Sequence, residues 1–142
     1  MALATCVPTT ATFRLHNFQG HTLNLAGGVN PVVSFTAHTP PGPNEKWSFT
    51  SDMELKGSSG EVVSSAMGSP SFGPGLAQAV TTSGTGLSLT VTCINATSAY
   101  ITEPALNALT AWAARHNELQ SPVTFEIITL GSEQAWTFEG LD

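Results

Sequence analysis

The sequence predicts an all-β domain built from three degenerate repeats of four short strands. Only 10% of the 142 residues are charged, and Gly, Pro, Ser and Thr are frequent, which favours short strands and turns over long amphipathic helices. Apolar and polar residues alternate over segments of four or five residues, as in half-buried strands. A strand–loop–strand stretch that reaches a tryptophan, residues 30–50, recurs at residues 121–139. The length fits one domain covering residues 1–142.

The first repeat, residues 11–51, shows the pattern most clearly. Leu23 and Leu25 share one strand face, and a link rich in proline and glycine precedes Trp47. The four strands are expected at residues 12–16, 21–25, 32–36 and 47–50.

The second and third repeats, residues 52–93 and 94–142, follow the same order of strands, but their motifs match those of the first repeat less closely. Leu87 takes the place of Trp47 in the second repeat, and Trp136 does so in the third. Tyr100 is matched to Phe13 at the start of the third repeat. The expected strands of the second repeat are 53–55, 61–64, 75–80 and 87–90.

Residues 104–120 allow two interpretations. Leu106, Leu109 and Ala113 fall at helical spacing in an Ala-rich and Leu-rich segment, so an isolated view predicts a helix. The repeat pattern instead requires strands near residues 107–113 and 121–129. We retain the strand prediction because internal repeats constrain the whole chain.

The charge balance excludes several classes of partner. The net charge is −6, and the four cations, Arg14, Lys46, Lys56 and Arg115, are scattered. Such a chain cannot neutralise a phosphate backbone, so no nucleic acid is expected, nor is an anionic membrane surface. Membrane insertion is not expected either, because no apolar run approaches the length of about 20 residues that spans a bilayer.

The N-terminal segment and the cysteines indicate a cytoplasmic protein. Residues 1–13 lack the positive and apolar regions of a secretory signal, so a cytoplasmic location is expected, and unconventional release is left open. Cys6 and Cys93 are expected to be partly buried free thiols in that compartment, although whether they pair is left open.

Enzymatic chemistry is not expected. None of the four histidines falls in a metal-ligand or catalytic-triad motif, and no pair of carboxylates stands out. The glycines near residue 84 lack the spacing and the lysine of a phosphate-binding loop. No metal and no cofactor are therefore expected.

Two short motifs resemble those of a known family. Asn44-Glu45-Lys46-Trp47 resembles the Asn-Gln-x-Trp signature of ricin-B-type lectin repeats, and Gln134-Ala135-Trp136 resembles its Gln-x-Trp core. Residues 22–28 look like the Leu-Asp-Leu-Ser-Gly-Gly stretch of fungal members. The chain thus resembles fungal (mushroom) ricin-B-type β-trefoil lectins and the related mushroom protease inhibitors. The resemblance implies a β-trefoil of six hairpins, forming a barrel and a cap, with Trp47, Leu87 and Trp136 as equivalent core residues.

The resemblance also implies a carbohydrate-binding pocket in the first repeat. Phe35 would stack on a sugar ring, and polar groups would bind the hydroxyls. The implied residues are Asn24, Gly27, Phe35, His38 and Asn44. Asn24 replaces the family's sugar-binding Asp, and Glu45 replaces the motif's Gln, so affinity or sugar preference is expected to differ.

Trp112 is a further candidate in the third repeat. It is either an exposed stacking surface or a packing residue. Phe35 and Asn44 have structural alternatives too, in the core and in the turn respectively.

The predicted function is binding of galactose- or N-acetylgalactosamine-type glycans through the first repeat. The alternative is a protease inhibitor that acts through a surface loop. The candidate loops are residues 27–30, 39–43 and 68–74. A storage or self-assembly role is a third hypothesis, and a homodimer is left open.

Overall fold

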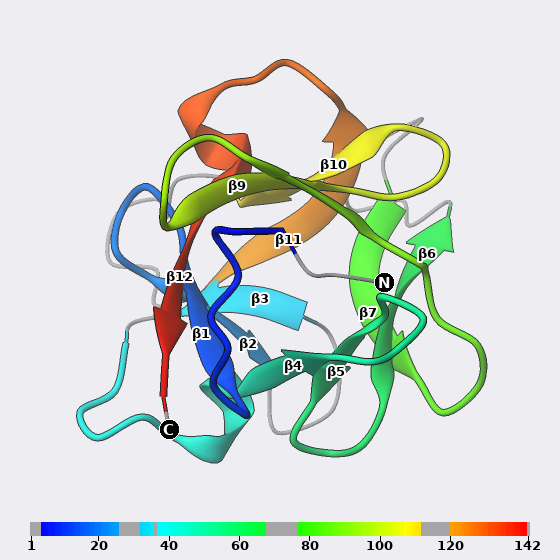
Figure 1. Cartoon of the computed structure of the whole chain (residues 1–142). Helices are drawn as coiled ribbons and strands as arrows, with labels where there is room; N and C mark the ends of the chain where they lie inside the picture. Colours follow the sequence, from blue (N-terminus) through cyan, green and yellow to red (C-terminus); the bar gives the residue numbers. More distant parts are fainter. Residues whose placement is uncertain (1–3, 26–31, 36, 68–76, 112–119, 142) are drawn as a thin grey trace.

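The structure, a computed structural model, is an all-β fold, with twelve strands in the residues that it describes (Figure 1). It describes residues 4–25, 32–35, 37–67, 77–111 and 120–141. The strands are β1 (Phe13–His16), β2 (Thr22–Leu25), β3 (Val32–Phe35), β4 (Trp47–Phe49), β5 (Leu55–Gly57), β6 (Val62–Met67), β7 (Ala77–Thr82), β8 (Thr90–Cys93), β9 (Ser98–Thr102), β10 (Asn107–Ala111), β11 (Gln120–Ile127) and β12 (Ala135–Gly140). Two short 3-10 helices precede β4 and β12, namely η2 (Pro43–Glu45) and η3 (Ser132–Gln134).

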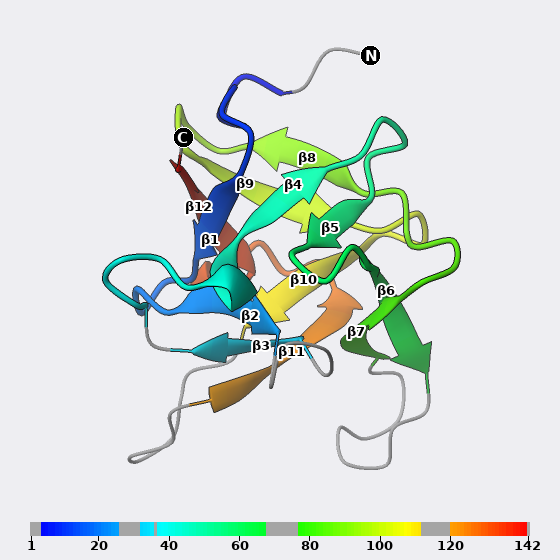
Figure 2. The same cartoon turned by 90° about the horizontal axis from the view of Figure 1, so that it is seen from below.

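The strands form a barrel and a cap. Strands β8, β9, β12, β1, β4 and β5 are neighbours in that order, and a backbone hydrogen bond from Leu89 N–H to Met53 O links the two ends. The hairpins β2–β3, β6–β7 and β10–β11 form the cap and join through the β3–β11 and β11–β7 pairings. Figure 2 shows β1, β4, β8 and β9 in the upper part of the view and β3, β7 and β11 in the lower part. This is the predicted β-trefoil.

Equivalent positions of the three repeats meet in the core. The pairs His16–Thr22, Lys56–Val62 and Thr102–Ala108 align the repeats, because each connects the first and second strands of its repeat. On this alignment, two sets of aliphatic side chains are fully buried: Leu15, Leu55 and Ile101, and Leu23, Val63 and Leu109. The periodic apolar positions of the sequence therefore supply the core that holds the repeats together.

Residues 107–111 and 120–127 are strands, so the predicted strands are confirmed and the helical interpretation is wrong for these residues. The β10–β11 register runs from the pair Asn107–Ile127 to the pair Ala111–Val123. Residues Ala108 to Ala111 are all buried, on both faces of the strand. A strand buried on both faces loses the period-2 signal, which explains why the segment has a helix-like sequence. Residues 112–119 lie outside the described residues.

Trp47 and Trp136 are buried core residues, as predicted. Trp47 Nε1–H donates to Leu23 O at 2.8 Å, and Trp136 Nε1–H donates to Leu109 O at 2.9 Å. The two acceptors are equivalent residues of β2 and β10. Each indole therefore buries its rings and still satisfies its one donor.

The prediction that Leu87 occupies the tryptophan position of the second repeat is wrong; Leu89 does. Two hydrogen-bonding patterns agree on this: the bond from Leu89 N–H to Met53 O, and the pairing of β8 with β9. Leu89 is buried, whereas Leu87 is only partly buried. The main-chain N–H of Leu87 donates to Val63 O, the equivalent of the carbonyl that accepts the indole N–H elsewhere. Without an indole, the backbone itself moves in to pair this carbonyl.

A one-residue error also affects the third repeat. Phe13 pairs with Trp47, and Ala99 pairs with Trp136, so Ala99 rather than Tyr100 corresponds to Phe13. Tyr100 corresponds to Arg14, and both side chains donate to a carbonyl of the loop before the 3-10 helix of their repeat. The aromatic match in the sequence was misleading because the core position holds a small residue.

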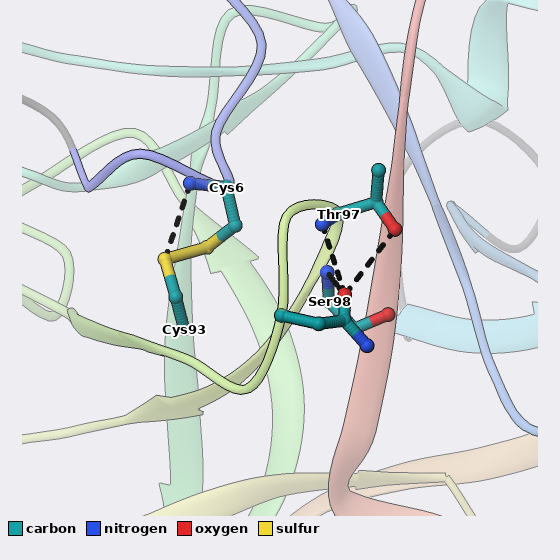
Figure 3. The surroundings of a disulfide bond; sticks show 5 residues. Cys6, Cys93, Thr97 and Ser98 are labelled. Atoms are coloured by element: carbon teal, nitrogen blue, oxygen red, sulfur yellow. Dashed lines mark hydrogen bonds between the residues drawn. A yellow bond between two sulfur atoms is a disulfide. The ribbon is translucent and has the colours of Figure 1, made fainter.

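Cys6 and Cys93 form a disulfide bond, so the expectation of two free thiols is wrong. The Cα atoms are 5.7 Å apart, and Cys6 N–H is directed at Cys93 Sγ (Figure 3). Cys6 and Val7 are buried against the barrel. The N-terminal segment is thereby fastened to β8, a proximity that a separation of 87 residues does not reveal.

Replacing both cysteines with serine should lower the free energy of unfolding by roughly 2–4 kcal/mol, because the long loop between them is no longer closed in the unfolded state. Urea denaturation of the double variant and of the oxidised wild type measures the difference. Wild-type protein treated with reductant should match the variant. Two free thiols in the purified wild type, or equal stabilities, would contradict the pairing.

No helix in the described part of the chain is long and apolar enough to cross a membrane.

Candidate functional site

A pocket of about 230 Å³ opens in the first repeat, between β2 and the loop that contains η2. Its lining residues are Asn24, His38, Gly42, Pro43, Asn44 and Glu45. Three of the six predicted carbohydrate-binding residues, Asn24, His38 and Asn44, thus face one cavity although they are spread over 21 positions of the sequence.

Glu45 holds the loop that forms this pocket. Its carboxylate is fully buried and accepts hydrogen bonds from Thr22 Oγ1 at 2.6 Å, Gly42 N at 2.9 Å and His38 N at 3.2 Å. These bonds tie both ends of the loop to β2 and leave the carboxylate little capacity to bind a ligand. Glu45 is therefore a structural clamp of the pocket, and the loop it fixes presents Asn44.

Arg14 supplies the positive charge that Glu45 requires. Its guanidinium lies 3.4 Å from the Glu45 carboxylate and 2.9 Å from that of Glu139, and it donates to His38 O at 2.8 Å. His16 Nε2 lies 2.6 Å from the same Glu139 oxygen. One cation of β1 thus connects β12, the pocket loop and the buried acid.

The pKa values of both acids are lowered. Burial raises the pKa of Glu45, but the hydrogen bonds from Thr22, Gly42 and His38, together with the charge of Arg14, outweigh it, so the net pKa lies below its ordinary value. The hydrogen bond from His16, followed by those from Arg14, lowers the pKa of Glu139. Glu45 is therefore ionised at neutral pH despite its burial.

The third repeat shows the neutral version of this clamp. Gln134 Oε1 accepts from Thr129 N and Leu130 N, and Gln134 Nε2 donates to Ile127 O. Tyr100 takes the position of Arg14. The charged Glu45 is thus accompanied by a cation and the uncharged Gln134 by a neutral residue, which explains physically why the first repeat can hold a buried acid where the third holds an amide.

Asn24 lies at the base of the pocket and is almost entirely buried. Its Nδ2 donates to Thr22 Oγ1 at 2.8 Å and to Thr22 O at 3.3 Å. Those bonds do not use the amide oxygen Oδ1. A carboxylate at this position would have no proton to donate to Thr22, so the local hydrogen bonds favour an amide here.

Phe35 and His38 form a stacked pair beside the pocket. Their ring centroids are 5.8 Å apart and their planes differ by 8°. The His38 side chain is 54% exposed, whereas Phe35 is partly buried. The exposed flat surface is therefore the imidazole of His38, supported by Phe35.

The described residues show this arrangement in the first repeat alone. The strand pairings place Thr82 and Glu126 at the positions equivalent to Phe35. In the second repeat, a Cβ added at Gly86 would lie 2.7 Å from Val63 O, so the chain fills the space against β6. Gly27 and Trp112 lie outside the described residues, as do the candidate loops 27–30 and 68–74.

The sequence did not predict the supporting role of Arg14. It is the one cation of the first strand, 31 residues before Glu45. A buried acid in place of the motif's Gln is the signal that could have prompted a search for such a partner. Within the described residues, no three His, Cys, Asp or Glu side chains gather where they could hold a metal ion.

Comparison with known proteins identifies the fold. No protein-family model and no curated protein matches the sequence. The ricin B-like lectin of Macrolepiota procera, solved in complex with lactose, superposes with a TM-score of 0.74 at 18% identity over 99% of this chain and 100% of that one. A non-toxic homologue of type II RIPs from Momordica charantia, in complex with α-methyl-D-galactoside, gives 0.67 at 18% identity over 95% and 49%.

An exo-β-1,3-galactanase from Clostridium thermocellum also superposes, with a TM-score of 0.72 at 16% identity over 95% of this chain and 31% of that one. At such low sequence identities, the structural similarity shows a shared fold and nothing further. The chain is a β-trefoil whose structural neighbours include ricin B-like lectins.

Proposed function

We propose that this protein is a non-enzymatic lectin that binds galactose- or N-acetylgalactosamine-type glycans through the pocket of the first repeat. The observation that supports this most is the exposed His38 ring, stacked on Phe35 at the edge of a pocket lined by polar groups. A flat ring can pack against the apolar C–H face of a pyranose while amide groups bind its hydroxyls.

The polar groups of the pocket suit hydroxyl recognition. Asn44 contributes an amide that both donates and accepts, and Asn24 contributes its Oδ1. Glu45 keeps the loop in place without itself contacting the sugar. The resulting site is neutral where the family has a carboxylate, so we expect weaker binding than a charged acceptor would provide.

The structural neighbours support the sugar class. The Macrolepiota lectin was solved with lactose and the Momordica protein with a galactoside, and the Clostridium enzyme is a galactanase. These ligands and activities belong to those proteins. They make lactose the first sugar to test, and the sequence resemblance adds N-acetylgalactosamine.

Isothermal titration with lactose should show binding with a Kd of about 1 mM or tighter. His38→Ala and Asn44→Ala should each weaken it about 10-fold, because each removes one contact of a small ligand. Lys56→Ala, at an exposed position of β5, is the matched control and should bind as wild type.

Absence of binding to lactose, N-acetylgalactosamine and a glycan array by the folded protein would refute the lectin proposal. Inhibition of papain-like or serine proteases in a parallel titration would then favour the alternative, a protease inhibitor. Such an inhibitor would act through a surface loop such as residues 39–43, where Thr39 and Pro40 are exposed.

A further inference from the structure

Residues 95–97 read Asn-Ala-Thr and lie in the turn between β8 and β9. Asn-x-Ser or Asn-x-Thr, with any residue except proline at x, is the acceptor motif for N-linked glycans. Among the asparagines of the chain, only Asn95 stands in this motif. The motif is remote in sequence from the residues that line the carbohydrate pocket, so that site does not account for it.

The turn that carries the motif is exposed to solvent. Residues 94–97 are all exposed, and so are Thr90 and Thr92 on the outer side of β8. Strands β8 and β9 stay paired as far as Cys93 and Ala99, so the motif forms the tip of a hairpin. An oligosaccharide attached at this tip would extend into solvent without displacing a neighbouring strand.

The hydrogen bonds of the turn use the oxygen of the Asn95 amide. Asn95 Oδ1 accepts from the main-chain N–H groups of Thr97 and Ser98, each at 2.9 Å, and the Thr97 hydroxyl lies 3.4 Å from the same oxygen (Figure 3). Thr97 O accepts from Phe138 N–H at 2.8 Å, which fixes the turn to β12. A glycan is attached to Nδ2 and leaves Oδ1 in place, so the turn can keep these bonds when it is modified.

The disulfide provides a second, independent indication. Cys93, which pairs with Cys6, lies two residues before Asn95. Disulfides form in oxidising compartments such as the lumen of the endoplasmic reticulum and are rare in the cytosol. N-linked glycans are attached to chains that enter the same lumen. Residues 1–13 do not resemble a secretory signal, so the disulfide indicates a compartment other than the cytoplasm that this segment predicts.

We propose that Asn95 is an N-glycosylation site, to which an oligosaccharyltransferase transfers a glycan from a polyprenyl-diphosphate-linked oligosaccharide. Asn95 Nδ2 forms a bond to C1 of the first sugar as the bond between C1 and the diphosphate oxygen breaks. The lipid diphosphate leaves with the electron pair of that bond, and a base of the transferase takes the amide proton. The site lies in the β8–β9 turn and the pocket in the first repeat, so this proposal does not depend on sugar binding.

The protein isolated from its natural source provides the direct test. In mass spectrometry, the peptide that contains residue 95 should carry a mass excess. Peptide-N-glycosidase should remove this excess and leave Asp at position 95. An unmodified Asn95 in the natural protein would overturn the proposal, whether or not the protein binds lactose.

Substitutions of Thr97 separate the motif from the fold of the turn. The full chain, secreted by a eukaryotic host from a cleavable leader, should migrate as a larger species that peptide-N-glycosidase converts to the unmodified size. Thr97→Ser keeps the hydroxyl and should keep the larger species, whereas Thr97→Val and Asn95→Gln should abolish it. Thr97→Val retains the N–H that donates to Asn95 Oδ1, so circular dichroism should show it folded. A larger species that persists in Thr97→Val, or that is missing from the wild type, would also overturn the proposal.

Discussion

Replacing Trp47 with Ala is expected to lower the free energy of unfolding by about 3–5 kcal/mol. The side chain is 1% exposed at the centre of the fold, and its loss would leave a cavity and an unpaired Leu23 carbonyl. Urea denaturation followed by circular dichroism measures the change. Trp136→Ala should have a similar effect because Trp136 is its counterpart in the third repeat. A loss below about 1 kcal/mol would contradict the assigned core role.

The second repeat provides a matched comparison. Leu89→Ala should cost about 2–5 kcal/mol, as expected for a buried leucine, whereas Leu87→Ala should cost clearly less because Leu87 is only partly buried. The reverse order would show that Leu87 occupies the tryptophan position after all.

Replacing Arg14 with Met is the second change with a large expected effect. It should lower the free energy of unfolding by about 3–5 kcal/mol, because the buried Glu45 carboxylate would lose its counter-charge. Glu45→Gln in the same background should recover much of the loss, since Gln134 functions with a neutral neighbour. A double-mutant cycle in urea measures the coupling. An Arg14→Met cost that Glu45→Gln leaves unchanged would show that the pair is not the cause.

The dependence on pH distinguishes this clamp from simple packing. The folded-state pKa of Glu45 lies below its ordinary value of 4.5, so its contribution to stability is complete above that value and is lost as the pH falls toward the folded-state pKa. Wild-type stability should therefore decline below about pH 4.5, and Glu45→Gln should reduce the slope. Equal slopes would contradict the assignment.

Sequence periodicity predicted the fold because the repeats share features that survive divergence. Alternating apolar positions such as Leu23 and Leu25 identify strands, and the two tryptophans set the register of the first and third repeats. The second repeat lacks a tryptophan, so nothing in the sequence fixed its last strand, and the assignment was displaced by two residues. Leu87 and Leu89 have the same hydropathy, and only the backbone hydrogen bonds show which of the two occupies the tryptophan position.

Other features depend on distances that a sequence does not contain. The Cys6–Cys93 disulfide joins the N-terminal segment to β8. The resemblance predicted three of the six residues that line the pocket, because those residues belong to or adjoin the family's motif. Arg14 could not be predicted this way, since it reaches the pocket loop from β1, where it contacts both the Glu45 carboxylate and the main-chain carbonyl of His38.

A lactose titration followed by ¹H–¹⁵N correlation spectra tests the proposed function most directly. Binding in the first repeat predicts chemical-shift changes concentrated at the amides of His38, Gly42 and Asn44, with none at the equivalent segment of the second repeat, residues 84–88. Spectra that stay unchanged at saturating lactose and N-acetylgalactosamine, or shifts confined to residues away from the pocket, would contradict a glycan site in the first repeat.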